Sequence, residues 1–342
     1  MSFRFDGILR LQEKKKQKKA RYFMSCLYHY CSNEKFYSIL QEKNIRMGDI
    51  CKSNDSRELQ LFYPDLLTTI LRKYQEAPFP FLLGNLTDYD AVKELVRSSD
   101  KIWLARFGSG DFSNFVVCFS KVKDSLSQWR GYADDGRGGC IGFSLEALRD
   151  YCDASDGVLR LEKVEYTDER QIRDTITYYA ELALSKLKDL RRRVVDEITH
   201  DDYSPKTDDL ISFNFDSLIA GIYMESLCLK SKAFEEEQEW RIFLNKDAYK
   251  NADLLYRKED KSADSRNIDA TLNFLNNRID FRYTSDDLIP FCPLRFEEFP
   301  ENPVVEVWLG PKNKARESDI NLFLHKYGYY NVKVNYSGIT YR

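Results

Sequence analysis

A run of carboxylates leads straight into an apolar segment between residues 230 and 244. Four of the five residues from Glu235 to Glu239 are glutamates, and the next five, Trp-Arg-Ile-Phe-Leu, have the composition of a strand that enters a core. Carboxylates are rarely buried without a partner. A fold that contains this strand therefore has to place its charged entrance in water, beside a counter-charge, or beside a ligand.

Two interpretations of this segment stay open. In the first, Glu235 to Glu237 form a solvated acidic turn and Arg241 pairs with a neighbouring carboxylate. In the second, the two-residue period of a strand puts Glu237, Glu239 and Arg241 on one face, where a fixed pair of carboxylates could hold a sugar hydroxyl or a metal ion.

Composition limits the classes of protein that fit. The 342 residues include 43% apolar and 14% aromatic side chains, which is typical of a folded globular chain. The formal charge of −3 argues against a nucleic-acid footprint over the whole chain. Eight cysteines without metal-ligand spacing, no secretory segment and no 18-residue apolar run predict a soluble cytoplasmic protein without structural zinc.

Basic residues are concentrated near the start of the chain. Residues 10–21 carry seven basic side chains and one acid on helix-forming sequence, so we expect a basic N-terminal helix within residues 1–24. Such a helix is usually solvated, and it is also a candidate contact for RNA, DNA or an acidic protein.

The first part of the chain alternates short strands and helices. We expect a strand over 26–32 that ends at Ser32, a helix capped by that serine, and His29 near its N-terminus. We further expect a strand at 45–47, a polar loop at 48–58, a helix entered at Pro64, a short helix at 89–96, and strands at 102–105 and 115–119.

Two glycine-containing stretches follow. The stretch 108–113 leaves no room for a phosphate-binding helix before the next strand, which excludes a dinucleotide-binding loop. Farther on, Gln128, Trp129 and Tyr132 have helical spacing and precede a glycine-rich turn back into a strand at 140–143. These aromatic side chains suit a core or, beside Gln128, a planar ring such as nicotinamide.

The rest of the chain predicts a helical insertion and the closing strands of a sheet. Helices over 168–199 and after Pro205 make a helical insertion at 168–230 that covers the sheet or meets a protein partner. Strands at 279–283, 288–291, 304–310 and 332–336 surround a helix near 320–324. We therefore predict one α+β domain over 1–342 with a mixed, mostly antiparallel sheet.

Several blocks of sequence resemble the bacterial DUF2971 family of unknown function. They are Leu27-Tyr-His-Tyr-Cys-Ser, Asn54-Asp-Ser-Arg-Glu58, Cys118-Phe-Ser, Gln128-Trp-Arg-Gly-Tyr-Ala, Gly138-Gly-Cys-Ile-Gly-Phe, Glu237-Gln-Glu-Trp-Arg-Ile and Ser337 to Arg342. Genes of that family are often found near mobile elements and phage-defence genes, so the resemblance implies a defence or toxin role.

The order of single residues is also similar, more weakly, to the ADP-ribosyltransferase fold, which implies a split sheet and NAD as substrate. On that resemblance Glu239 would hold the nicotinamide ribose, Glu237 would orient an acceptor, and Tyr132 or Trp129 would stack on nicotinamide. The candidate catalytic residues are Glu239, Glu237 and Tyr132. The candidate NAD-binding residues are His29, Tyr30, Ser32, Ser120, Gln128, Trp129 and Arg241.

Three functional hypotheses follow. The first is an NAD-consuming enzyme, either an ADP-ribosyltransferase or an NAD glycohydrolase. The second is a metal-dependent nuclease, with Asp55, Glu58, Asp134 and Glu239 as ligands and Lys230 or Lys232 as the charge partner. The third is a non-enzymatic module that senses a nucleotide or a partner, in which the segment from Glu237 to Arg241 is an internal salt-bridge cluster.

Overall fold

A computed structural model describes residues 25–50, 56–103, 115–155, 158–197, 205–244, 278–283 and 287–341. The predicted basic helix at 1–24 and Asp55 lie outside the described residues. The strands are β1 (Cys26–Cys31), β2 (Asn44–Asp49), β3 (Leu82–Leu83), β4 (Leu86–Thr87), β5 (Phe115–Ser120), β6 (Gly139–Ser144), β7 (Leu159–Lys163), β8 (Glu165–Thr167), β9 (Leu229–Ser231), β10 (Glu239–Leu244), β11 (Asp280–Tyr283), β12 (Leu288–Arg295), β13 (Val304–Leu309) and β14 (Lys333–Tyr336). The helices are α2 (Asn33–Glu42), α3 (Ser56–Glu76), α4 (Asp88–Trp103), α5 (Leu126–Tyr132), α6 (Leu145–Asp153), α7 (Glu169–Glu197), α8 (Pro205–Ser226) and α11 (Glu317–Lys326), with short 3₁₀ helices η3 (Asp134–Gly136), η5 (Lys232–Glu237) and η6 (Phe296–Glu298).

The prediction of a mixed, mostly antiparallel sheet in an α+β fold is confirmed. Ten described strands form one sheet, in which the pair β13–β14 is parallel and the other pairs are antiparallel. The helix capped by Ser32 is present as α2, whose Lys35 amide donates to Ser32 Oγ at 3.4 Å. Among the described residues, no helix has both the length and the apolar composition needed to cross a membrane.

Two predicted elements differ from the structure. The helix expected to begin at Pro64 begins at Ser56, so the proline lies inside α3, where packing against α4 and α7 holds the helix. The strand expected at 102–105 is wrong at its start, because Ile102 and Trp103 are the last residues of α4. A short apolar run does not distinguish a strand from the end of a helix.

The sheet forks at β5. One edge of β5 pairs with β10 from Val116 to Ser120. The other edge is shared, because β2 pairs with Phe115 and Val116 while β1 pairs with Ser120. One branch continues as β1-β6-β13-β14 and the other as β2-β12-β11. The fork therefore leaves a gap between β1 and β2, opposite the middle of β5.

The two faces of the sheet carry different helices. One face, with Leu27, Phe119, Ile141 and Ile242, packs against α2, α6 and α11 in the largest hydrophobic cluster. At one end of the other face, α5 packs on Tyr28, Tyr30 and Cys140 through Trp129. This second face is the one that receives the side chains of Ser120, Glu239 and Arg241, because residues directly opposite in an antiparallel pair point the same way.

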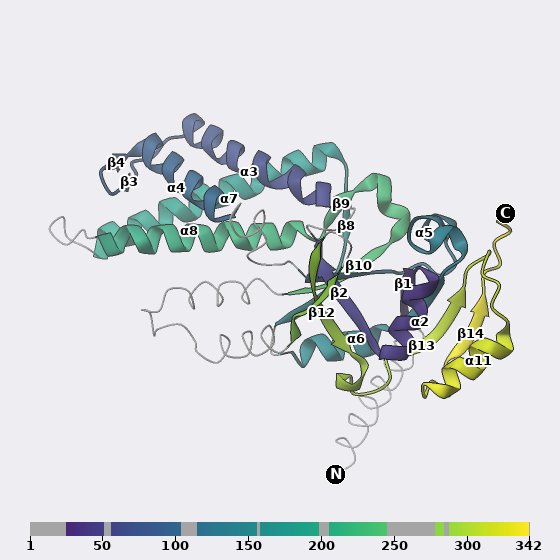
Figure 1. Ribbon diagram of the computed structural model, residues 1–342. Helices are drawn as coiled ribbons and strands as arrows, with labels where there is room; N and C mark the ends of the chain where they lie inside the picture. Colours follow the sequence, from purple (N-terminus) through teal and green to yellow (C-terminus); the bar gives the residue numbers. More distant parts are fainter. Residues whose placement is uncertain are drawn as a thin grey trace, which may run out of the picture.

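Four helices from two distant parts of the sequence form a helical layer at the other end of the second face. Helices α3 and α4 pack with α7 and α8 around a second hydrophobic cluster that includes Val116 and Phe243 of the sheet. Figure 1 shows these four helices side by side, with the sheet to their right. Helices α7 and α8 of the predicted insertion thus pack with α3 and α4 as well as with the sheet.

Candidate functional site

The entrance to β10 is a tight turn. Residues Lys232–Glu237 form the 3₁₀ helix η5, so Glu237 lies before the strand and the predicted alternation from Glu237 is wrong at that residue. Gln238 has a left-handed backbone, with φ of 44°, and its carbonyl accepts from the Lys121 amide at 2.9 Å. Ser120 Oγ donates to the Glu237 carbonyl at 2.5 Å. The turn is therefore fixed against the end of β5.

Lys230, Glu237, Glu239 and Arg241 form a buried ion cluster. Lys230 Nζ donates to Glu237 Oε2 at 2.7 Å and to Glu239 Oε2 at 3.1 Å. Arg241 donates from Nε to Glu239 Oε1 at 2.8 Å and from Nη2 to Glu239 Oε2 at 3.1 Å. The four side chains are between 0% and 11% exposed. Two cations thus balance two carboxylates within a region that water hardly reaches.

The charges of the ion cluster support one another. Burial alone would raise the pKa of Glu239, but the charge and hydrogen bonds of Arg241, with the charge of Lys230, outweigh it, so this pKa lies below its ordinary value. Each of the four carboxylate oxygens accepts at least one hydrogen bond, since Tyr132 Oη donates to Glu237 Oε1 at 3.0 Å. The ion cluster is therefore neutral overall and well supplied with donors.

Aromatic side chains enclose the ion cluster. Tyr132, at the end of α5, is 43% exposed and reaches inward through its hydroxyl. The ring of Phe234 lies 4.9 Å from Lys230 Nζ. Tyr166 Oη accepts from the Glu239 amide at 2.7 Å, and burial is the main cause that raises the pKa of Tyr166 to about 12. Tyr132 is thus the part of this network that is nearest to solvent.

The structure brings together five of the ten candidate residues named from the sequence, namely Ser120, Tyr132, Glu237, Glu239 and Arg241. Trp129 is fully buried and donates from Nε1 to Asp124 at 2.8 Å, and Gln128 beside it in α5 is buried too. Tyr30 packs edge-on against Trp129 and donates to the Val122 carbonyl at 2.9 Å. Ser32 caps α2. Trp129, Tyr30 and Ser32 thus make structural contacts, and Trp129 offers no exposed face to a planar ligand.

His29 lies on the opposite face of the sheet from the ion cluster. Tyr28 shares the face of Ser120, so the next residue along β1 points the other way, and its ring contacts Phe119 at 6.0 Å between centroids. His29 Nδ1 is 3.0 Å from the Cys118 carbonyl, in the gap where β5 pairs with neither β1 nor β2. The structure therefore does not place His29 and Glu239 in one cleft.

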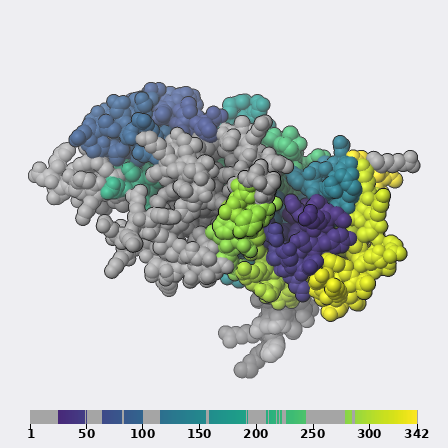
Figure 2. Space-filling view, viewed as in Figure 1, coloured from purple at the N-terminus to yellow at the C-terminus, as the bar shows by residue number. Residues whose placement is uncertain are grey.

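The gap beside His29 opens into a cavity of about 370 Å³, here called the His29 cavity. Its walls come from β1, α2, β2, β11 and β12. They are formed by His29, Lys35, Ser38, Ile39, Glu42, Asn44, Ile45, Arg46, Gly48, Arg282, Ile289, Pro290 and Phe291. In Figure 2 the purple residues 25–50 and the lime-green residues 278–295, which supply this lining, lie side by side on one face. Apart from His29, the lining was not predicted, because it depends on the fork.

The predicted nuclease ligands do not come together among the described residues. Asp134 is exposed and accepts two hydrogen bonds from Arg137, while Glu239 belongs to the ion cluster. Asp55 and the side chain of Glu58 lie outside the described residues. In the part of the chain that is described, no group of three or more histidine, cysteine, aspartate or glutamate side chains is arranged to hold a metal ion.

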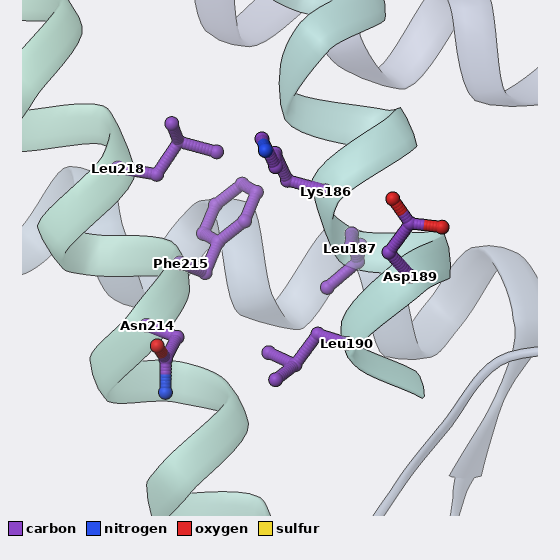
Figure 3. Close-up of a pocket in the computed structure, with 7 residues that line it drawn as sticks. All are labelled: Lys186, Leu187, Asp189, Leu190, Asn214, Phe215 and Leu218. Carbon is purple, nitrogen blue, oxygen red and sulfur yellow. The ribbon is translucent and has the colours of Figure 1, made fainter. Parts of the chain in front are cut away.

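A smaller apolar groove of about 230 Å³ lies between α7 and α8. Figure 3 shows Phe215 and Leu218 of α8 pointing toward α7, which contributes Leu187 and Leu190. The predicted partner contact on residues 168–230 stays a prediction, and this groove is the described feature nearest to it.

Residues 128–242 match the model of a family described as a protein of unknown function (DUF2971). The resemblance predicted from the sequence is thus confirmed over this part of the chain. The matched part contains residues 128–132 of α5, with Tyr132, and the whole ion cluster, but not the His29 cavity. No curated protein and no solved structure matches the chain, and the resemblance to ADP-ribosyltransferases stays unconfirmed.

Proposed function

We propose that this chain is a nucleotide-sensing module that binds its ligand in the His29 cavity without consuming it. The observation that carries the proposal is the cavity itself, where the fork of the sheet joins an apolar floor to a cationic rim. A concave site of a few hundred Å³ with a few placed polar groups is the usual form of a small-molecule site.

The charges at the rim favour an anionic ligand. Lys35, Arg46 and Arg282 face one carboxylate, that of Glu42, which is 3.0 Å from Arg46 Nη2. Neither Lys35 nor Arg282 forms an ion pair with another described residue. Two cations therefore remain for the phosphate of a nucleotide, and arginine in particular matches phosphate with two parallel donors.

The ion cluster supports sensing rather than turnover. Arg241 binds Glu239 through two nitrogens, and Lys230 holds the same carboxylate from the other side. A reaction at Glu239 would have to break these bonds in a buried site, which costs several kcal/mol of lost ion pairing. His29 is also separated from Glu239 by the sheet. The NAD-consuming hypothesis thus loses the joint site on which it depended, while NAD stays among the nucleotides to be tested.

The proposal is tested by calorimetric titration of the purified protein with AMP, GMP, CMP, UMP, ATP and NAD. Gly48 lines the cavity, and a Cβ placed on it would meet no atom of the described residues within 4 Å, its two chain neighbours apart. Gly48→Val should therefore fill the site and abolish nucleotide binding while the protein stays folded. Gly131, in α5 and away from the cavity, has the same free space, so Gly131→Val is the matched control and should bind like the wild type.

Two results would overturn the proposal. One is the absence of binding for every nucleotide in the panel. The other is release of nicotinamide from NAD by the wild type and not by Glu239→Gln, which would restore the enzymatic hypothesis. We expect Glu239→Gln to lower stability and to leave nucleotide affinity unchanged. The defence role implied by the family resemblance stays a prediction.

A further inference from the structure

We infer that the His29 cavity takes a mononucleotide whose base lies on the apolar floor and donates an N–H to His29 Nε2, with its phosphate at the rim beside Lys35 and Arg282. This inference rests on the proposed function and adds the orientation of the ligand and the chemistry by which its base is recognised.

The tautomer of His29 determines what the floor offers. The Cys118 carbonyl can only accept, so Nδ1, 3.0 Å away, carries the proton. Burial, with a smaller contribution from Lys35, lowers the pKa of His29 to about 4, so the ring is neutral near pH 7. Nε2 is then a hydrogen-bond acceptor. No other described residue donates to it, which leaves it for a donor on the ligand.

The remaining floor is apolar and the rim is charged. Ile39, Ile45 and Phe291 are buried, whereas Lys35, Arg46 and Arg282 are exposed. Arg46 is held in place at the rim, since its guanidinium lies 4.5 Å from the centre of the Phe291 ring and pairs with Glu42. A ligand with a flat, weakly polar end and an anionic end can satisfy both regions in only one orientation. That orientation puts the base inside and the phosphate outside.

The size of the cavity selects among nucleotides. About 370 Å³ is near the lower end of the range of roughly 300–1,000 Å³ that small-molecule sites span. A mononucleotide fits this volume better than a dinucleotide, so the inference favours AMP, GMP, CMP or UMP over NAD. A base without an N–H donor would cover Nε2 and leave it without a hydrogen bond, and such a loss is expensive for an acceptor shielded from water.

The first experiment changes the ligand and leaves the protein intact. The best-binding mononucleotide of the panel is compared, by calorimetry on the wild type, with an analogue whose base N–H groups carry methyl groups, such as N6,N6-dimethyl-AMP for AMP. We expect the methylated analogue to bind about tenfold more weakly or worse, because one buried acceptor loses its donor. Equal affinity would refute the role of His29, although the nucleotide site itself would stand.

The second experiment tests the orientation. Arg282→Gln should weaken the nucleotide several-fold and leave the affinity of the matching nucleoside, which lacks the phosphate, unchanged. His29→Phe should bind the methylated and the unmethylated nucleotide with equal affinity, because the acceptor that distinguishes their bases is gone. If Arg282→Gln weakens nucleoside and nucleotide equally, the phosphate does not lie at the rim and the inferred orientation is wrong. Failure of all nucleotides to bind would instead refute the proposed function.

Discussion

Replacing Lys230 with methionine should destabilise the protein strongly. The ammonium group is fully buried and is the only described cation that contacts both Glu237 and Glu239, at 2.7 and 3.1 Å. Lys230→Met fills a similar space without the charge and leaves Arg241 opposite two buried carboxylates. Breaking a buried ion pair from one side typically costs about 3–5 kcal/mol. We expect a loss of this size in the free energy of unfolding, measured by urea titration with tryptophan fluorescence.

A second substitution separates charge balance from packing. Lys230→Met combined with Glu237→Gln again leaves one cation with one carboxylate, and the glutamine still accepts from Tyr132. We expect the double variant to recover most of the loss, because a balanced buried site costs far less than an unpaired charge. If the double variant is as unstable as Lys230→Met alone, the loss comes from packing and the charge argument fails.

The pH dependence of stability gives an independent check. In the wild type the pKa of Glu239 lies below its ordinary value, so its contribution is present above pH 4.5 and is lost as the pH falls through the lowered pKa. In Lys230→Met we expect a buried carboxylate without its cation to take up a proton more readily, so the loss of unfolding free energy relative to the wild type should shrink on going from pH 8 toward pH 5. If Lys230→Met loses less than about 1 kcal/mol of unfolding free energy, or if the loss does not change with pH, the interpretation of a buried charge cluster is refuted.

Three further predictions concern single contacts. Tyr132→Phe removes one hydrogen bond to Glu237 from a half-exposed side chain, so urea titration should show a loss of about 0.5–1.5 kcal/mol, and a larger loss would mean that Tyr132 holds the turn. Ser32→Ala removes the cap of α2 and should cost about 1 kcal/mol in the same assay, and no loss would contradict the capping contact. The pKa of His29 is lowered from 6.5 to about 4, so between these values the unfolded chain binds a proton that the folded chain does not. Wild-type stability should therefore decrease as the pH is lowered from 6.5 to about 4. His29→Phe should lack this slope, while Lys35, Arg46, Arg282 and Glu42 stay in place in both proteins, and equal slopes would rule out His29 as its source.

The regular elements followed from local sequence patterns. Apolar spacing and Ser32 located β1 and α2, and the long stripe of apolar residues located α7. The failures at Pro64 and Ile102 occurred where packing among α3, α4, α7 and α8 overrides a local signal. The pairing of helices from two distant parts of the sequence depends on tertiary contacts that a pattern along the chain does not contain.

The candidate site was only partly predictable. The glutamate run pointed to the ion cluster, because carboxylates next to a core strand need partners, and Arg241 lies two residues on. The left-handed Gln238, which turns both Glu237 and Glu239 inward, gave no sequence signal. His29 was recognised, but its side of the sheet depends on the register of β1 with β5, and the cavity beside it depends on the fork.

Cys118 touches both sites, so it tests whether they act separately. Its carbonyl accepts from His29 Nδ1, and its side chain lies on the other face of the sheet, where Cys118 stands opposite Arg241 of the ion cluster in the β5–β10 pair. Cys118→Ala removes the thiol and keeps the carbonyl, and a thiol is a weak donor, so we expect a stability loss of about 1 kcal/mol from urea titration. The pH slope assigned to His29 and the nucleotide affinity should both stay unchanged. If either one changes with the thiol, the ion cluster controls the His29 cavity through β5. The two faces of the sheet would then form one functional unit. The hydrogen bond between His29 and the Cys118 carbonyl does not by itself require such coupling, because it involves only the backbone of Cys118.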